Sequence, residues 1–208
     1  MNDRPAPPAR LELKALRSRL AGPFSLSVDA GAFVAISGVS GSGKSLFLRL
    51  IADLDPGEGE VRLDGQERRA CAPTAWRRRV TYVAAESGWW KASAAEHFRP
   101  DDVDAARNLS ERFGVGRAQF DGPVEHLSTG ERLRLSLVRA FVLRPPVLLL
   151  DEPTGALDPE TTLAVEAYLK EAAQDGTAVL IVTHNMDQIG RLDAAHYRMV
   201  DRKLEPGQ

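Results

Sequence analysis

The chain has little cysteine and lacks any long apolar segment. Cys71 is the one cysteine among 208 residues, so no disulfide can form within the chain, and this usage fits a reducing compartment. No apolar run approaches the roughly 20 residues that cross a bilayer, and no signal peptide opens the chain. We therefore expect a cytoplasmic protein that works at a membrane only through another subunit.

An excess of positive charge is also absent. The formal net charge is −2 at pH 7, so the chain lacks the overall basic footprint of proteins whose main partner is nucleic acid. Arginines are clustered locally in WRRR at residues 76–79, which we interpret as a solvated approach to a strand rather than a lipid or nucleic-acid patch. The length favours one compact domain with an inserted lobe.

Residues 1–10 are rich in proline and polar side chains, so we expect a flexible tail followed by a single domain at residues 11–208.

Alternating and continuous apolar patterns predict several β-strands. LELKAL and FSLSVD alternate apolar with polar residues, as half-buried strands do. VLLLDE and AVLIVTH are almost continuously apolar, which is typical of strands buried on both faces of a parallel sheet. FVAISG, GEGEVRLDG and VTYVAAE complete the predicted strands.

Charged, helix-compatible sequence replaces strands from residue 87 onward. We expect a helical subdomain at approximately residues 87–143, inserted in an α/β core. Between the last two predicted strands, TTLAVEAYLKEAAQDG has helical spacing and ends at a glycine. This pattern predicts a right-handed βαβ unit.

The sequence GVSGSGKS at residues 38–45 matches the pattern G-x-x-x-x-G-K-[ST] completely. Its glycines allow backbone N–H groups to turn around phosphate oxygens, and the following helix directs its positive end to the same point. Lys44 would carry charge to the β- and γ-phosphates, and the Ser45 hydroxyl is a candidate Mg²⁺ ligand. A strand before and a helix after disfavour an incidental glycine-rich turn. The expected nucleotide contacts are Gly38, Val39, Ser40, Gly41, Ser42, Gly43, Lys44, Ser45 and Leu46.

Two adjacent carboxylates end one of the most apolar predicted strands. Asp151 and Glu152 end VLLLDE, at the carboxyl end of a strand, where open α/β sheets place their ligand crevice. Adjacent strand positions point in opposite directions, so Asp151 would hold Mg²⁺ while Glu152 would orient and deprotonate an attacking water. The alternative is a solvated acid pair, which the phosphate loop disfavours.

Four histidines are present, and one stands out by position. His184 ends AVLIVTH, so it faces the same expected crevice as the acid pair. His97, His126 and His196 lack such a placement, and we interpret them as structural.

The segment LSTGE at residues 127–131 has two readings. Ser128 and Glu131 form a capping-box pattern at a helix start. Ser128 and Gly130 also place a hydroxyl and N–H groups at a positive helix end, which is a second candidate phosphate-binding element.

The set GVSGSGKS, LSTGE, VLLLDEPTGALD and VTH, in this order, resembles the ATP-binding subunits of ABC transporters from Leu11 to Asp201. The resemblance implies an α/β fold: a P-loop NTPase core with a mostly parallel sheet, an N-terminal antiparallel β-subdomain and an inserted α-helical subdomain. It also implies ATP and Mg²⁺ as cofactors and ATP hydrolysis as the activity. Lys44, Glu152 and His184 match the family's catalytic groups, with Glu152 as the base and His184 as the histidine that contacts the γ-phosphate.

The resemblance also implies that two chains work together. The signature residues that would complete the site of a second copy, or of a paralogous ATPase subunit, are Ser128, Thr129, Gly130 and Glu131. Asp158, in GALD, matches the loop that couples two sites across the dimer. A separate integral-membrane permease would read the dimer's motion, which implies a location at the cytoplasmic face of the cell membrane.

Several positions depart from the family pattern. Members usually have a glutamine after the strand corresponding to VTYVA, where this chain has Ala85 followed by Glu86. Alanine cannot coordinate a metal, so Glu86 becomes a candidate Mg²⁺ ligand, although its carboxylate would also repel the γ-phosphate. Leu46 replaces a hydroxyl residue and Thr129 replaces a glycine, which together predict slow or partner-dependent turnover.

The expected base-binding aromatic is missing. Family members stack adenine on an aromatic side chain upstream of the phosphate loop, whereas no aromatic residue precedes Phe24 here. Arg17 or Arg19 could lay a guanidinium plane on the base instead. We expect weak selectivity for adenine.

Trp89 and Trp90 occupy the region that faces the permease's coupling helix in the family. Two large aromatic side chains beside Lys91 would anchor a partner helix. The alternative is burial within the helical subdomain.

Other function classes remain open beside transport: an ABC-type ATPase in DNA repair or translation, a module that holds ATP without turnover, and a small-molecule P-loop kinase. A single cassette without long coiled coils disfavours the first, and LSTGE has no role in the last. The transported substrate and its direction are not predicted.

Overall fold

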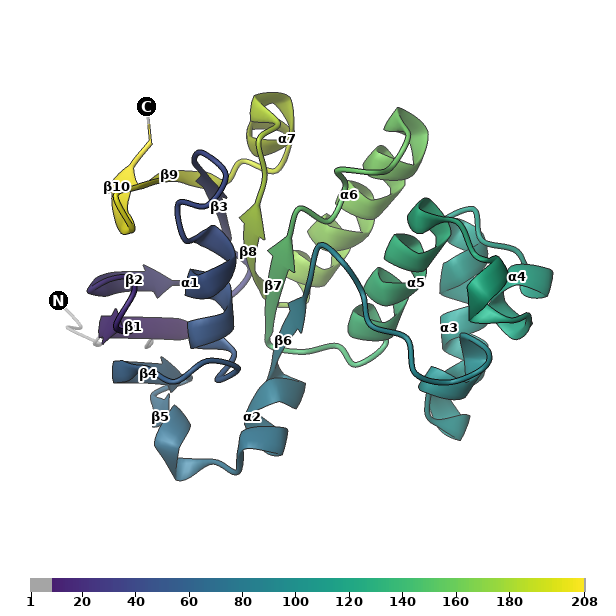
Figure 1. The fold of residues 1–208 in the computed structure, drawn as a ribbon, viewed down its shortest axis with the longest axis horizontal. Coiled ribbons are helices and arrows are strands. Elements are labelled where there is room, and N and C mark those ends of the chain that lie inside the picture. The colour runs from purple at the N-terminus through teal and green to yellow at the C-terminus, as the bar shows by residue number, and fades with distance from the viewer. Residues whose placement is uncertain (1–8, 208) are drawn as a thin grey trace, which may run out of the picture.

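Two β-sheets organise residues 9–207, which are the residues that the computed structural model describes (Figure 1). Residues 1–8 of the predicted flexible tail lie outside this range. At its end, Arg10 is anchored, because its guanidinium lies 2.8 Å from the Asp64 carboxylate and its carbonyl accepts the Asp64 N–H. No helix within the described range is long and apolar enough to cross a bilayer.

The first sheet is the predicted antiparallel one, with strand order β2-β1-β4-β5. In β1, the buried positions Leu11 and Leu13 follow the alternating pattern, whereas an irregularity between Leu13 and Leu16 shifts the register so that Leu16 is buried in place of Ala15. The four strands are β1 (Leu11–Arg17), β2 (Phe24–Val28), β4 (Glu58–Leu63) and β5 (Gln66–Glu67).

The second sheet has six strands in the order β10-β9-β3-β8-β7-β6. The β9–β10 pairing is antiparallel and the other four pairings are parallel, which confirms a mostly parallel core sheet. All five positions of β7 and of β8 are buried, as their continuous apolar sequence predicts. The bounds are β3 (Phe33–Ser37), β6 (Val80–Val83), β7 (Val147–Asp151), β8 (Ala178–Val182), β9 (Ala195–Val200) and β10 (Lys203–Pro206).

Side chains of this sheet alternate between two hydrophobic cores. Leu149 and Leu180 point to the core shared with α1 and the antiparallel sheet. Leu148 and Ile181 point to the opposite core, which α5 and α6 cover (Figure 1). The helices that flank the sheet are α1 (Lys44–Ile51), α2 (Pro73–Arg79), α5 (Thr129–Phe141), α6 (Pro159–Gln174) and α7 (Met186–Arg191).

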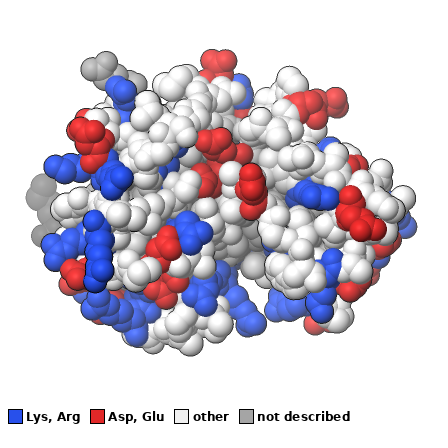
Figure 2. Space-filling model, in the orientation of Figure 1, with Lys and Arg blue, Asp and Glu red and all other residues white. Residues whose placement is uncertain are grey.

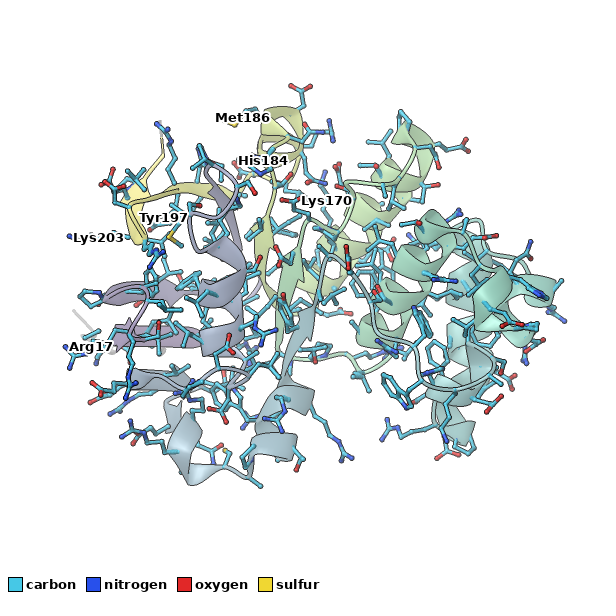
Figure 3. All side chains as sticks on the ribbon, viewed as in Figure 1. Arg17, Lys170, His184, Met186, Tyr197 and Lys203 are labelled. Carbon is cyan, nitrogen blue, oxygen red and sulfur yellow. The ribbon has the colours of Figure 1, made fainter. Side chains whose placement is uncertain are left out.

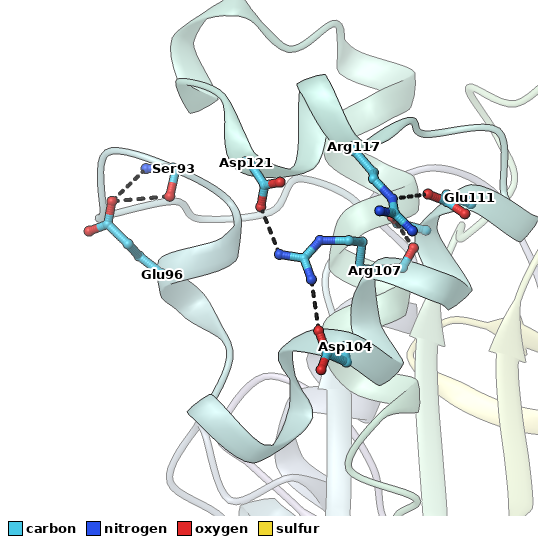
Figure 4. Close-up of polar contacts among 8 residues, drawn as sticks. Ser93, Glu96, Asp104, Arg107, Glu111, Arg117 and Asp121 are labelled. Atoms are coloured by element: carbon cyan, nitrogen blue, oxygen red, sulfur yellow. Dashed lines mark hydrogen bonds and ion pairs between the residues drawn. The ribbon is translucent and has the colours of Figure 1, made fainter.

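Helices and short 3-10 turns make up the predicted helical subdomain, which lies to the right of the sheet in Figure 1. On its surface Arg107 bridges the Asp104 and Asp121 carboxylates at 2.8 and 3.2 Å, which joins α3 to α4 (Figure 4). Exposed ion pairs of this kind contribute about 0–1 kcal/mol each. Before and beside α5, the elements are η2 (Ala95–His97), η3 (Pro100–Asp102), α3 (Val103–Arg112), α4 (Arg117–Asp121) and η4 (Val124–His126).

The reading of WRRR as a solvated approach to a strand is wrong at its first residue. These residues end α2, and Trp76 is fully buried, with its Nε1–H donating to the Ile51 carbonyl at 3.0 Å. The arginines that follow stay at the surface: Arg79 contacts Gln66, and Arg78 is exposed. Figure 2 shows basic side chains along the lower left of the molecule, over β4, β5 and α2, with acidic side chains among them.

Candidate active site

The phosphate-loop sequence connects the end of β3 to the start of α1. Gly38, Gly41 and Gly43 have φ angles of 143°, 74° and 106°, in the left-handed region that favours glycine. Gly43 is the N-cap of α1 and supplies no side chain to the helix end. The first N–H groups of α1 therefore face the loop without a side-chain acceptor, which suits an incoming phosphate.

Lys44 is held inside this loop. Its side chain is 6% exposed, and its Nζ donates to the carbonyl oxygens of Gly38 and Val39 at 2.7 and 3.0 Å. The neighbouring Ser42 hydroxyl is buried and has no hydrogen-bond partner among residues 9–207. A buried ammonium group, an unpartnered hydroxyl and a helix N-terminus together form a set of donors for an anion.

Asp151 ends β7 beside a tyrosine that sequence reasoning did not single out. Asp151 is 5% exposed, and its Oδ2 accepts a hydrogen bond from Tyr82 Oη at 3.0 Å. Burial, and then the Asp151 charge, raises the pKa of Tyr82 far above its ordinary range, so the phenol stays a donor. Tyr82 pairs with Leu149, two residues before Asp151, so both side chains share one face of the sheet. Finding Tyr82 from the sequence would have required the register between β6 and β7.

Glu152 and His184 come together at the ends of the adjacent strands β7 and β8. The Nε2 atom of His184 lies 3.4 Å from Oε1 of Glu152, and both side chains are about half exposed, at 53% and 45%. Glu152 has a φ of 49°, and its N–H donates to the Val182 carbonyl at 3.1 Å. The chain therefore turns sharply at Glu152, and a non-glycine residue in this conformation stores strain, as is common at functional sites. Figure 3 labels His184 at the upper end of the sheet.

The LSTGE segment starts helix α5, and the predicted capping box is confirmed. Ser128 Oγ accepts the Glu131 N–H at 3.3 Å, while Glu131 Oε2 accepts hydrogen bonds from Ser128 N and Oγ at 2.8 and 2.7 Å. These bonds, led by that from the Ser128 hydroxyl, hold the pKa of Glu131 below its ordinary range. Ser128 and Thr129 are exposed, so this capped helix end is open at the surface.

Asp158 caps the next helix. Its carboxylate accepts the N–H and the hydroxyl of Thr161 at 2.8 and 2.7 Å, which lowers the pKa of Asp158. The segment that precedes it lies close to LSTGE, because a Cβ added at Gly130 would be 3.4 Å from the Ala156 carbonyl oxygen.

The oxygen ligands available to a metal are few. Within residues 9–207, no three His, Cys, Asp or Glu side chains gather closely enough to hold a metal ion. A hydroxyl at Ser45 and the second carboxylate oxygen of Asp151 nevertheless fit Mg²⁺, which is commonly held by one or two protein oxygens plus substrate phosphates. Glu86 is exposed and makes no hydrogen bond or ion pair with the described residues, and Ala85 is exposed beside it.

A cavity of about 1080 Å³ opens between the β1–β2 loop and α1. Arg17, one of the two candidate base contacts, is engaged there by the Glu58 carboxylate, with Nη2 at 2.8 Å. Arg19 and Leu20 are exposed on the same wall, and Leu46 of α1 lies opposite. The cavity thus offers a guanidinium group and two aliphatic side chains in place of an aromatic ring.

Trp89 and Trp90 lie around one histidine. The His97 ring makes edge contacts with both indoles at 4.9 and 4.6 Å, and its Nε2 accepts the N–H groups of Trp90 and Lys91. The Arg139 guanidinium lies over both tryptophan rings, at 4.7 and 5.1 Å. Trp89 packs against the second core, whereas Trp90 is 70% exposed. The structural interpretation of His97 holds, and its role is to shape this loop.

Comparisons with known proteins agree with this geometry. Residues 22–155 match the family model described as ABC transporter. The chain is 36% identical to the phosphonates import ATP-binding protein PhnC of Hyphomonas neptunium, over 79% of this chain and 71% of that protein. It is 32% identical to the lipoprotein-releasing system ATP-binding protein LolD of Rickettsia bellii, over 84% of each chain.

The fold is shared with a solved structure as well. The dimeric post-hydrolysis state of the ATP-binding cassette MJ0796, bound to ADP and Pi, superposes with a TM-score of 0.80, at 23% identity, over 95% of this chain and 97% of that one. The family match covers the phosphate loop, the capped signature helix and the acid pair in one segment. The chain therefore belongs to the ABC transporter family, as an ATP-binding subunit with ATPase activity.

Proposed function

We propose that this chain energises a separate membrane permease as one half of an ATP-driven, head-to-tail pair. The observation that carries the proposal is the exposed helix end at Ser128, which the chain's own hydrogen bonds cap but do not cover. A second N–H-rich helix end, separate from the phosphate loop, supports a phosphate site completed by another copy.

In the chain's own site, the phosphate loop binds the nucleotide. Lys44 leaves the loop carbonyls for the β- and γ-phosphates, and the open N-terminus of α1 receives the same anion. Ser45 and Asp151 hold Mg²⁺, which neutralises charge on the phosphates when bound. Glu86 is an additional candidate ligand, in place of the glutamine that the family has near Ala85.

Hydrolysis uses the Glu152–His184 pair. Glu152 accepts the proton of the attacking water, and His184 contacts the γ-phosphate from the neighbouring strand end. The 3.4 Å separation of their side chains supports a shared task, because one group can orient the other.

The second chain supplies the remaining contacts. Its signature residues, Ser128 to Glu131, reach the γ-phosphate, and Asp158 couples the two sites. The MJ0796 cassette is dimeric in its ADP- and Pi-bound state, which supports pairing of this chain with itself or with a paralogous subunit.

The permease docks on the loop shaped by His97. Trp90 is the exposed anchor, beside Lys91, while Trp89 supports the loop from below. The related PhnC and LolD proteins serve import of phosphonates and release of lipoproteins. These different tasks support transport as the function without selecting a substrate, at the cytoplasmic face of a membrane.

The nucleotide base enters the cavity between the β1–β2 loop and α1. With Arg17 engaged by Glu58, Arg19 is the guanidinium left to stack on the base. Leu20 and Leu46 offer apolar contact without hydrogen-bond discrimination, which supports weak preference for adenine over guanine.

A second candidate function is favoured by Ala85, an exposed alanine where family members carry a metal-contacting glutamine. In this reading the chain holds ATP and turns it over slowly, as a regulatory module.

The test is Glu152→Gln, which removes the base and keeps the side chain's shape. We expect phosphate release to slow by about 10²–10⁴-fold, while ATP binding is retained. Glu160→Gln, an exposed acid at the start of α6, is the matched control and should keep the wild-type rate. An unchanged rate in Glu152→Gln contradicts the assignment of the base.

A further inference from the structure

A buried glutamine joins three elements behind the Glu152–His184 pair. Gln188, in α7, is 0% exposed. Its Nε2 donates to Thr154 Oγ1 at 3.1 Å and to Glu166 Oε1 at 3.0 Å. Its Oε1 lies 3.4 Å from Thr154 Oγ1, which can donate to it, and its backbone N–H donates to Asn185 Oδ1 at 3.1 Å. Buried polar groups of this kind fix one arrangement when every partner is in place.

An ion pair between buried Glu166 and surface Arg191 holds the other partner of this glutamine in place. Glu166 of α6 is 2% exposed, and the Arg191 guanidinium contacts both of its carboxylate oxygens at 2.7 Å. The two ends of α7 are thus attached to one residue of α6, through Gln188 and Arg191. A fork of two charge-assisted bonds fixes direction as well as distance.

The network begins and ends next to the catalytic pair. Thr154 follows Glu152 by two residues, in a tight turn where Gly155 N–H donates to the Glu152 carbonyl. His184 precedes α7, which begins at Met186. The side chains of His184 and Met186 lie at the upper end of the sheet in Figure 3. A hydrogen bond between Thr154 and Gln188 therefore links the segment that carries Glu152 to α7, the helix that begins two residues after His184.

We infer that Gln188 and Thr154 are positioning residues that hold His184 against Glu152. This inference rests on the proposed function, in which Glu152 is the catalytic base and His184 contacts the γ-phosphate. A static link is needed here because Glu152 and His184 are half exposed and touch each other at 3.4 Å without further side-chain support among the described residues. Small displacements of catalytic groups lower turnover strongly, on the order of 10²-fold for 1 Å.

Thr154→Val and Thr154→Ser test the link as a matched pair. Valine keeps the shape of threonine and removes the hydroxyl, whereas serine keeps the hydroxyl. We expect Thr154→Val to lower kcat by about 5- to 50-fold with unchanged ATP affinity of the monomer, and Thr154→Ser to restore most of it. Gln188→Leu should match Thr154→Val, and Asp187→Asn, an exposed neighbour on α7, is the control with wild-type kinetics.

A double-mutant cycle with His184→Ala separates positioning from general stabilisation. If Thr154 acts through His184, Thr154→Val causes no further loss of kcat in the His184→Ala background. If Thr154→Val lowers kcat equally in the wild-type and His184→Ala backgrounds, the positioning inference is overturned and the proposed function is not. The same holds if Thr154→Val has a wild-type kcat while His184→Ala is slow. A wild-type kcat for His184→Ala removes the proposed role of His184 and the inference with it. Urea unfolding of each variant verifies that it is folded.

Discussion

Tyr82 donates a hydrogen bond to Asp151 across two neighbouring strands, with 3.0 Å between Oη and Oδ2. The bond occupies one carboxylate oxygen of a residue that is almost fully buried, and it leaves the other oxygen for the Mg²⁺ that we propose Asp151 holds. The orientation of Asp151 is thus set by β6, the strand that leads directly to Ala85, Glu86 and the loop shaped by His97. A change in the loop after β6 would be transmitted to Asp151, the proposed metal ligand, through one strand.

Tyr82→Phe removes this hydrogen bond without emptying the space. A hydrogen bond to a charged group contributes about 1.5–3 kcal/mol, so we expect the Mg²⁺ concentration for half-maximal turnover to rise by about 10-fold or more. Nucleotide affinity measured with Mg²⁺ should fall, whereas affinity measured in EDTA should not. Tyr197→Phe, on β9, is the matched control, and equal Mg²⁺ dependence of the two variants would contradict the role of Tyr82.

The capping box at α5 predicts a pH dependence. Hydrogen bonds from Ser128 lower the pKa of Glu131 in the folded state. The stability that ionised Glu131 contributes is therefore present above its unfolded pKa of about 4.3 and is lost as the pH falls through the lower folded value. We expect the stability difference between wild type and Glu131→Gln, measured by urea unfolding, to be constant from pH 7 to 5 and to shrink below about pH 4. A difference that does not change with pH would refute this.

Alanine substitution of Trp89 and of Trp90, in the loop shaped by His97, should have different effects. Trp90→Ala removes an exposed ring, so basal ATPase activity and folding stability should stay near wild type while stimulation by the permease is lost. Trp89→Ala removes a ring that packs against the core and under Arg139, so it should destabilise the fold by roughly 2–4 kcal/mol. ATPase assays with and without reconstituted permease, together with urea unfolding, distinguish these outcomes. Permease-stimulated turnover in Trp90→Ala would exclude it as the anchor.

Local sequence patterns predicted most of this molecule. The phosphate loop, the acid pair and the capping box are short segments whose geometry depends on neighbouring residues, so glycine positions and apolar runs located them. The features that were missed depend on contacts between distant segments. Tyr82 required the register between β6 and β7, and Trp76 required the position of α1, whose end it covers.

The polar network behind the site was missed for the same reason. Gln188 looks like an ordinary surface residue of a short helix, and only the packing of α7 on α6 brings it to Glu166 and Thr154. The hairpin of β9 and β10 was not predicted either, because AHYRMV and KLEP carry a weak apolar pattern with mostly half-exposed or exposed positions.

Pairing of two chains is the central claim, and Ser128→Arg addresses it. The bulky charge at the open end of α5 should leave ATP binding by the monomer intact and abolish both ATP-driven dimerisation and turnover. Light scattering with ATP in the Glu152→Gln background measures dimerisation. Ser27→Arg, which places the same charge on the exposed face of β2, should dimerise normally.

The most direct measurement mixes two inactive variants, Ser128→Arg and Lys44→Ala, and follows phosphate release. In a head-to-tail pair, a mixed dimer contains one site with both an intact Lys44 and an intact Ser128, contributed by different chains. We predict that the mixture recovers turnover, up to about a quarter of the wild-type rate if half of the pairs are mixed and each has one working site of two. A mixture as inactive as either variant alone would contradict a site shared between two copies.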